Sequence, residues 1–288
     1  MAPEAMEIKH TSEPMNASRG VRHITTAFQS ARETRRAALM PYFTLGFPDP
    51  QSSVEIVAAI AASGADLIEL GVPFSDPLAD GPTIQHSTQV ALEQGTTPAV
   101  CLELVGQIRA RGVEQPLLLM GYINPMLAYG LPRFIEHAAA AGADGLIVPD
   151  LPPEEAGEIQ ALCAAAGLAL VFLAAPNSSA ARLAVVAENS SGFLYLVSLT
   201  GVTGARAQLP PDLADFIQRA RATTDLPLAV GFGISSPQQA ASVGEQADGV
   251  IVGSALIRAA AQASQPVVAS QQFVQSLRDG LERRNVDG

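Results

Sequence analysis

The sequence predicts an α/β fold, a single (β/α)₈ TIM barrel with an extra helix at its N-terminal side. The chain has 288 residues, 48% of them hydrophobic and 16% charged, which is typical of a globular protein and suits one large barrel. Eight short apolar segments alternate with helical patterns, and no linker-like break interrupts them. The first apolar segment is followed by "TLGFPDP" rather than by the GxGxxG of many doubly wound sheets, so a closed barrel is favoured.

Two regions are expected along the chain. Residues 1–23 are polar and lack the apolar core of a signal peptide, so we predict a flexible N-terminal tail. Residues 24–288 are predicted to form the catalytic barrel domain, which begins with the extra helix over 24–35. No apolar run approaches the roughly 18 residues of a membrane span.

The elements alternate in order along the chain, and local signals mark several of their ends. Gly142 and Gly167 follow helical patterns, where glycine commonly ends a helix. Glu154 and Glu155 follow two prolines and suit the positive end of a helix dipole. The predicted strands are 38–46, 66–71, 116–122, 144–150, 168–176, 192–198, 227–233 and 248–254. The predicted helices after the first strand are 52–63, 83–94, 98–111, 132–142, 152–167, 179–189, 211–223, 236–242, 256–262 and 266–284.

Composition excludes several kinds of chemistry. The net charge is −11 and there is no basic run, which argues against a nucleic-acid partner. The only lysine is Lys9, in the predicted tail, so imine aldolase and pyridoxal phosphate (PLP) chemistry within this chain are not expected. The four histidines show no zinc-ligand spacing, so no metal is expected. Cys101 and Cys163 lie in helical patterns without CxxC spacing, which fits buried thiols and a cytoplasmic location.

Carboxylates are the remaining candidates for catalysis, and two of them follow the second predicted strand. The segment "LIELGVPFSDPLADGP" places Glu69 in an apolar strand and Asp80 in the loop after it. In a barrel, active residues lie at the carboxyl ends of the strands, so both are expected on the catalytic face. The alternatives are a salt bridge from Glu69 to an arginine and a helix N-cap role for Asp80, with Thr83 three residues later. Asp76 is interpreted as a loop-ordering or partner-contacting residue.

Three glycine-rich stretches follow the last three strands: "TGVTGAR", "GFGIS" and "GSA". In barrels the loops after strands 7 and 8, with a short extra helix, often bind phosphate. Glycine lets the backbone approach an anion, and free N–H groups at a helix N-terminus donate hydrogen bonds to it. Ser254 could add a hydroxyl. An acidic chain with few cations would need such backbone donors to hold a phosphate.

In this order the motifs "LIELGVPFSDPLADGPTIQ", "GYINP", "PDLPPEE", "TGVTGAR" and "GFGIS" resemble the tryptophan synthase alpha subunit family, from about Tyr42 to Arg258. The resemblance implies a barrel that cleaves indole-3-glycerol phosphate to indole and glyceraldehyde 3-phosphate. It also implies a PLP-containing beta subunit as partner, in an alpha2beta2 complex. The loops 73–79 and 124–129 are expected at that contact.

The same resemblance assigns roles to individual residues. Glu69 matches the acid/base catalyst, and Asp80 matches the residue that binds and polarises the indole N–H. Tyr42 stands where some members carry Phe against the indole, and Tyr195 matches the family tyrosine near the glycerol phosphate. The positions that match the family's phosphate contacts are Gly204, Gly233, Gly253 and Ser254.

Three other functions stay open at this point. A sugar-phosphate isomerase or epimerase would share the glycine sites but would not need the "SDPLADG" block, and an epimerase would need metal-binding histidines. A non-catalytic phosphate-binding subunit would have no use for Glu69 and Asp80 in one pocket. A stand-alone indole-3-glycerol-phosphate lyase would share every motif and differ from the subunit in its loops and interface.

Overall fold

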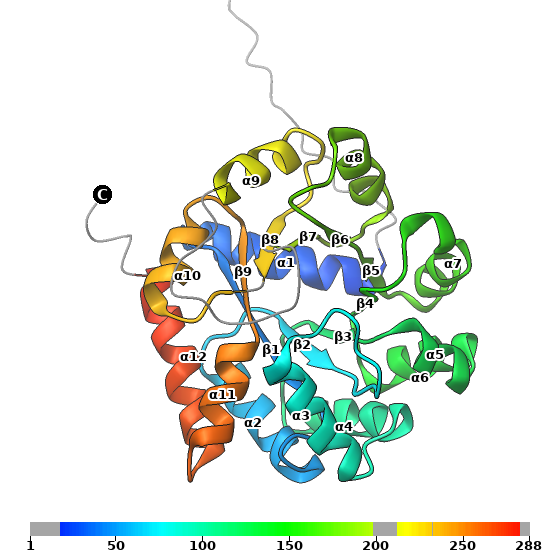
Figure 1. Cartoon of the computed structure of the whole chain (residues 1–288), viewed down its shortest axis with the longest axis vertical. Coiled ribbons are helices and arrows are strands. Elements are labelled where there is room, and N and C mark those ends of the chain that lie inside the picture. Colours follow the sequence, from blue (N-terminus) through cyan, green and yellow to red (C-terminus); the bar gives the residue numbers. More distant parts are fainter. Residues whose placement is uncertain (1–17, 198–211, 232, 283–288) are drawn as a thin grey trace, which may run out of the picture.

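The computed structural model describes residues 18–197, 212–231 and 233–282, as parallel strands surrounded by helices (Figure 1). The strands are β1 Ala38–Thr44, β2 Ile68–Gly71, β3 Leu117–Met120, β4 Gly145–Ile147, β5 Ala169–Val171, β6 Leu173–Ala174, β7 Leu194–Val197, β8 Leu228–Gly231 and β9 Gly249–Val252. The helices are α1 Arg19–Glu33, α2 Pro50–Ala62, α3 Pro82–Glu93, α4 Pro98–Ala110, α5 Ile123–Tyr129, α6 Leu131–Ala141, the 3₁₀ helix η1 Pro153–Glu155, α7 Gly157–Ala166, α8 Ala180–Asn189, α9 Leu213–Arg221, α10 Pro237–Gly244, α11 Ser254–Gln262 and α12 Pro266–Glu282.

The sheet is a nearly closed barrel. Its strand order is β5-β4-β3-β2-β1-β9-β8-β7-β6. The two end strands, β5 and β6, are separated in the chain only by Phe172. They are two pieces of the single strand predicted over 168–176, because β5 pairs with β4 while β6 pairs with β7. The eight predicted strands therefore appear as nine segments, and the (β/α)₈ barrel fold is confirmed.

Apolar side chains fill the barrel interior and the space between the strands and the helices. Fully buried Met40, Leu118 and Val171 belong to the inner cluster. Helix α1 lies across one end of the barrel, behind the strands in Figure 1, and adds Ile24 and Phe28 to this cluster. The extra N-terminal helix thus closes one end of the interior and leaves the other end for the site.

Helix α1 begins earlier than the sequence predicted, at Arg19, because the hydroxyl of Ser18 accepts a hydrogen bond from the backbone of Val21 and caps the helix. Buried Asp144 anchors this helix, since one of its oxygens lies 3.0 Å from His23 Nδ1. Residues 1–17 lie outside the described residues, so the division into a tail (1–23) and a barrel domain (24–288) remains a prediction, except that residues 19–23 belong to α1. Among the described helices none is long and apolar enough to cross a membrane.

Candidate active site

Glu69 lies in β2, two residues before the last residue of that strand, and is fully buried. Its Cα is in register with Tyr42 on β1 and with Leu118 on β3, which directs its side chain into the barrel. Neither carboxylate oxygen has a hydrogen-bond partner among the described residues. Burial raises the pKa of Glu69 to about 8, because the ionised form would lose its hydration. Among the described residues Glu69 forms no ion pair, so the alternative prediction, a salt bridge to an arginine, is not observed there.

Asp80 lies in the loop between β2 and α3 and accepts a hydrogen bond of 3.1 Å from the hydroxyl of Tyr122. The same hydroxyl accepts a hydrogen bond of 2.9 Å from the backbone N–H of Ala79. Burial raises the pKa of Asp80 to about 6, against the lowering effect of the Tyr122 hydrogen bond. The alternative N-cap role is wrong, because Gly81 is the N-cap of α3 and no side chain caps that helix end.

Two tyrosines extend over glycines of neighbouring strands. A Cβ on Gly71 would lie 2.0 Å from the hydroxyl of Tyr42, and a Cβ on Gly231 would lie 2.3 Å from the hydroxyl of Tyr195. Only glycine at these strand ends leaves room for the phenols. Burial raises the pKa of both tyrosines above the usual value, so both keep their proton at neutral pH.

Three of the four predicted phosphate positions lie at the ends of β8 and β9. Gly233 has a φ of 92°, which favours glycine, and follows β8. Gly253 is the N-cap of α11 and has no side chain to accept from the helix, while Ser254 is the first residue of that helix. The first N–H groups of α11 are therefore available to an anion. Gly204 lies outside the described residues.

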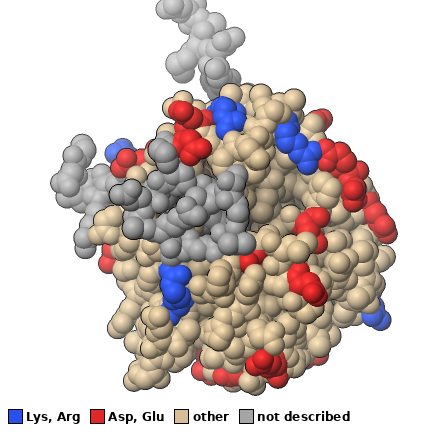
Figure 2. Space-filling model, in the orientation of Figure 1, with Lys and Arg blue, Asp and Glu red and all other residues tan. Residues whose placement is uncertain are grey.

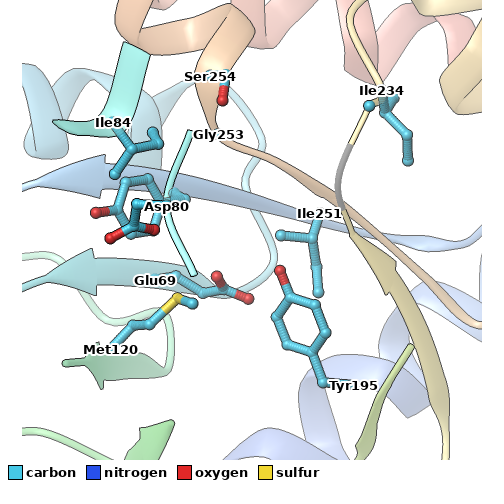
Figure 3. A pocket seen from close by; sticks show the side chains of 11 residues that line it. Glu69, Asp80, Ile84, Met120, Tyr195, Ile234, Ile251, Gly253 and Ser254 are labelled. Atoms are coloured by element: carbon cyan, nitrogen blue, oxygen red, sulfur yellow. The ribbon is translucent and has the colours of Figure 1, made fainter. Parts of the chain in front are cut away.

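One cavity joins these groups. It contains about 470 Å³ of space not filled by protein atoms, part of it open to solvent. In Figure 3 the carboxylate of Glu69 and the hydroxyl of Tyr195 point toward each other across it, with Ser254 on another side. Seven of the eight predicted site residues line this cavity: Tyr42, Glu69, Asp80, Tyr195, Gly233, Gly253 and Ser254.

The structure adds residues that the sequence analysis did not single out. Tyr122 acts through its hydrogen bond to Asp80. An apolar group, made of Ile84, Met120, Ile234 and Ile251, completes the cavity wall and suits the flat apolar face of an aromatic ring. The described lining contains no Lys, Arg or His, so within this part of the cavity the groups that can attract an anion are backbone N–H groups and the Ser254 hydroxyl.

The comparisons with known proteins agree with this geometry. The family model described as tryptophan synthase alpha chain matches residues 28–283. The tryptophan synthase alpha chain of Chloroflexus aggregans is 57% identical over 234 residues, which cover 81% of this chain and 88% of that protein. The one of Roseiflexus sp. (strain RS-1) is 51% identical over 257 residues, covering 88% and 98%.

The chain belongs to the tryptophan synthase alpha chain family.

Solved structures of the family share the fold. A chain of Mycobacterium tuberculosis tryptophan synthase superposes with a TM-score of 0.85 at 40% identity, covering 92% of this chain and 99% of that one. The tryptophan synthase alpha chain of Legionella pneumophila superposes with a TM-score of 0.84 at 38% identity, covering 92% and 98%. Membership of the tryptophan synthase alpha chain family rules out the isomerase, the epimerase and the non-catalytic phosphate-binding subunit.

Proposed function

We propose that Glu69 and Asp80 are the catalytic carboxylates with which this member of the tryptophan synthase alpha chain family cleaves indole-3-glycerol phosphate. The reaction breaks the bond between C3 of the indole and the hydroxyl-bearing carbon of the glycerol chain. C3 gains a proton and the hydroxyl loses one, which leaves indole and glyceraldehyde 3-phosphate with no net change in protons. The protein must therefore give a proton at one point and take one at another.

The observation that carries the proposal is the state of Glu69. Its carboxyl is buried, unpartnered among the described residues and directed into the cavity, and burial raises its pKa to about 8. At neutral pH it is therefore mostly protonated and can act as the acid, then accept the hydroxyl proton as the base. Asp80 has its pKa near 6 and is mostly ionised at the same pH, so it can accept a hydrogen bond from the indole N–H.

The remaining cavity residues hold the substrate. Tyr42 and the apolar wall take the indole ring, and Tyr195 contacts the glycerol phosphate. The backbone around Gly233 and Gly253, with the N–H groups and hydroxyl at the start of α11, binds the phosphate, helped by the helix dipole. Gly204 is proposed as a further phosphate contact.

The partner is a beta subunit. Joining indole to an amino acid by PLP chemistry requires a lysine in the active site, and Lys9 is the only lysine of this chain. We therefore place PLP in the beta subunit, no cofactor in this chain, an alpha2beta2 complex, and a cytoplasmic location. Two large apolar side chains are exposed on the segments proposed for the contact: Leu78, at 85%, in the loop 73–79, and Leu127, at 53%, on α5. Acidic side chains are scattered over the face seen in Figure 2, with isolated basic ones between them.

The experiment that tests this function measures indole release from indole-3-glycerol phosphate by the wild type and by Glu69→Gln. The substitution keeps size and hydrogen bonding but cannot transfer the proton, so we expect turnover to fall by about 10²–10⁴-fold or more. Substrate affinity should change little. Turnover above about a tenth of the wild-type value would remove Glu69 from the mechanism. The same assay with and without a cognate beta subunit separates the subunit from a stand-alone lyase.

A further inference from the structure

The motifs "GYINP" and "PDLPPEE" meet at the start of helix α5. The first contains Tyr122, the N-cap residue of α5, and the second contains Asp150, in the loop between β4 and η1. Oδ1 of Asp150 accepts a hydrogen bond of 3.0 Å from the backbone N–H of Ile123, the first residue of α5. Asp150 is exposed, and this is the one hydrogen bond of its side chain within the described residues.

Asp150 supplies an acceptor that the start of α5 otherwise lacks. The first N–H groups of a helix have no partner within the helix, and the side chain of the N-cap residue commonly accepts from one of them. Tyr122 makes no such bond, since its hydroxyl is hydrogen-bonded to Asp80 and Ala79. The carboxylate of Asp150 therefore satisfies the first of these N–H groups from the neighbouring loop.

The same hydrogen bond fixes the backbone that carries the Tyr122 side chain. The N–H of Ile123 and the carbonyl carbon of Tyr122 belong to one planar peptide group, so an acceptor for this N–H restricts the ψ angle of Tyr122, which is 154°. On the other side, the N–H of Gly121 donates a hydrogen bond of 3.1 Å to the carbonyl of Ile147, the last residue of β4. Of these two contacts, the one with Asp150 depends on a side chain, so a substitution can remove it.

From this position Tyr122 reaches the loop after β2. Its hydroxyl donates a hydrogen bond of 3.1 Å to Asp80 and accepts one of 2.9 Å from the N–H of Ala79. Its ring packs against that of Phe74 in the same loop, with 5.5 Å between the ring centroids. Because a hydrogen bond weakens steeply once its distance and angle leave the favourable range, a shift of the Tyr122 backbone would weaken the bond to Asp80.

We propose that Asp150 is a positioning residue for Asp80, which it holds in place through the backbone of Ile123 and the hydroxyl of Tyr122. Asp150 is not among the residues that line the described cavity, so it acts on the site by orienting Tyr122. This inference rests on the proposed catalytic role of Asp80.

The ionisation of Asp80 reports whether these contacts are intact. Burial raises its pKa and the Tyr122 hydrogen bond lowers it, with a net value of about 6. Three other titratable residues line the described cavity, and no cation does: Tyr42, Glu69 and Tyr195. Burial keeps these three protonated at pH 6, because it raises the pKa of each.

The sign of the change therefore separates positioning from charge. Weakening the Tyr122 hydrogen bond should raise the midpoint of the Asp80 ionisation. Removing the negative charge of Asp150 alone should lower it, because a nearby like charge disfavours the ionised form.

The decisive variant is Asp150→Ala in the full chain, with aspartate labelled by ¹³C at the carboxyl carbon and titrated by NMR. The Asp80 resonance is assigned by its loss in Asp80→Asn. We expect the Asp80 midpoint to rise by about half a pH unit, a threefold change, which is less than the roughly one unit for a hydrogen bond lost completely. A midpoint that is unchanged or lowered would overturn the inference. Because Asp150 is exposed, the variant loses no buried side chain and should fold.

Three further variants isolate the route. Asp150→Asn keeps an acceptor oxygen and loses only the charge, so its midpoint should stay at or below that of the wild type. In Tyr122→Phe no hydroxyl is left to position, so adding Asp150→Ala should give no further rise. Glu155→Ala removes another exposed carboxylate, on η1 in the same segment, and should cause no rise. A rise as large as that of Asp150→Ala in any of these three comparisons would overturn the inference.

Failure of this inference is distinguishable from failure of the proposed function. If Asp80→Asn kept the wild-type turnover, Asp80 would leave the mechanism. The NMR midpoints would still report whether Asp150 positions Tyr122 against Asp80.

Discussion

The hydroxyl of Tyr122 donates a hydrogen bond of 3.1 Å to Oδ2 of Asp80, and so connects the segment between β3 and α5 to the loop that follows β2. By also accepting from the backbone N–H of Ala79, it holds the loop just before the carboxylate. This contact fixes where Asp80 lies and stabilises its ionised form.

The variant Tyr122→Phe tests this contact. Burial alone would then set the pKa of Asp80, which should rise above about 6 because the lowering hydrogen bond is gone. Asp80 would be protonated at a higher pH, so the acid limb of the kcat/KM profile should move upward by roughly one pH unit, the order expected for one hydrogen bond to a charge. Steady-state kinetics between pH 5 and 9 measure it. An unmoved acid limb would show that Tyr122 orders only the loop.

The buried carboxyl of Glu69 also predicts how stability depends on pH. Its pKa is about 8 in the folded chain against 4.5 when unperturbed, so the folded state holds a proton that the unfolded state releases between these values. The bound proton of Glu69 therefore stabilises the folded state fully below pH 4.5, and this stabilisation is lost as the pH rises to about 8. The loss amounts to up to roughly 5 kcal/mol in the free energy of unfolding. Glu69→Gln lacks this proton.

Urea unfolding of the two proteins from pH 4.5 to 8.5 checks this expectation. The free energy of unfolding of Glu69→Gln, minus that of the wild type, should increase across this range. Asp80 and Asp144 titrate in both proteins, so their effects cancel in the difference. A difference that stayed constant with pH would mean that Glu69 is ionised in the folded protein.

Much of the fold and most of the site were predictable from the sequence, because they depend on local signals. Glycines end helices α6 and α7 in left-handed conformations, with φ of 101° at Gly142 and 76° at Gly167, as their sequence positions indicated. The placement of Glu69 and Asp80 at one cavity follows from strand order, because active residues of a barrel gather at the strand ends.

What could not be predicted depends on contacts between distant elements. Nothing around Tyr122 in "MGYIN" shows that its hydroxyl reaches Asp80, 42 residues away. In the sequence Gly71 looks like any glycine at the end of a strand. Only the structure shows that the Tyr42 hydroxyl occupies the space that a side chain at this position would need. The early start of α1 depends on Ser18 as its N-cap. This role could not be recognised in the sequence, because the neighbouring residues are polar too.

The phosphate site predicts a loss of binding when a side chain enters it. Gly253→Val would place a branched side chain between the start of α11 and Tyr42, whose Cβ already lies 3.3 Å from an added Cβ. We expect the affinity for glycerol 3-phosphate to fall by about tenfold to a hundredfold, because each lost hydrogen bond to an anion is worth about 1.5–3 kcal/mol. Gly157→Ala, on α7 with open space around it, is the control. Calorimetric titration measures both, and unchanged affinity in Gly253→Val would move the phosphate elsewhere.

The exposed apolar side chains near the site predict the surface that the beta subunit covers. Leu78 is 85% exposed, although burying a leucine is worth about 1.5–3 kcal/mol, and it lies two residues before Asp80. If the partner covers it, Leu78→Asp should weaken the complex by about tenfold to a hundredfold, since a charge would replace the buried side chain. Leu127→Asp should act in the same direction.

Val268→Asp is the matched control, because Val268 is also an exposed apolar residue, at 40%, but lies on α12 and not on either of the two segments proposed for the contact. Sedimentation of each purified variant with a cognate beta subunit gives the dissociation constants. Equal weakening by all three substitutions would indicate a general effect of the added charge. Wild-type affinity in both leucine variants would place the partner on another face, and the indole formed at Glu69 would then need a different route to the beta subunit.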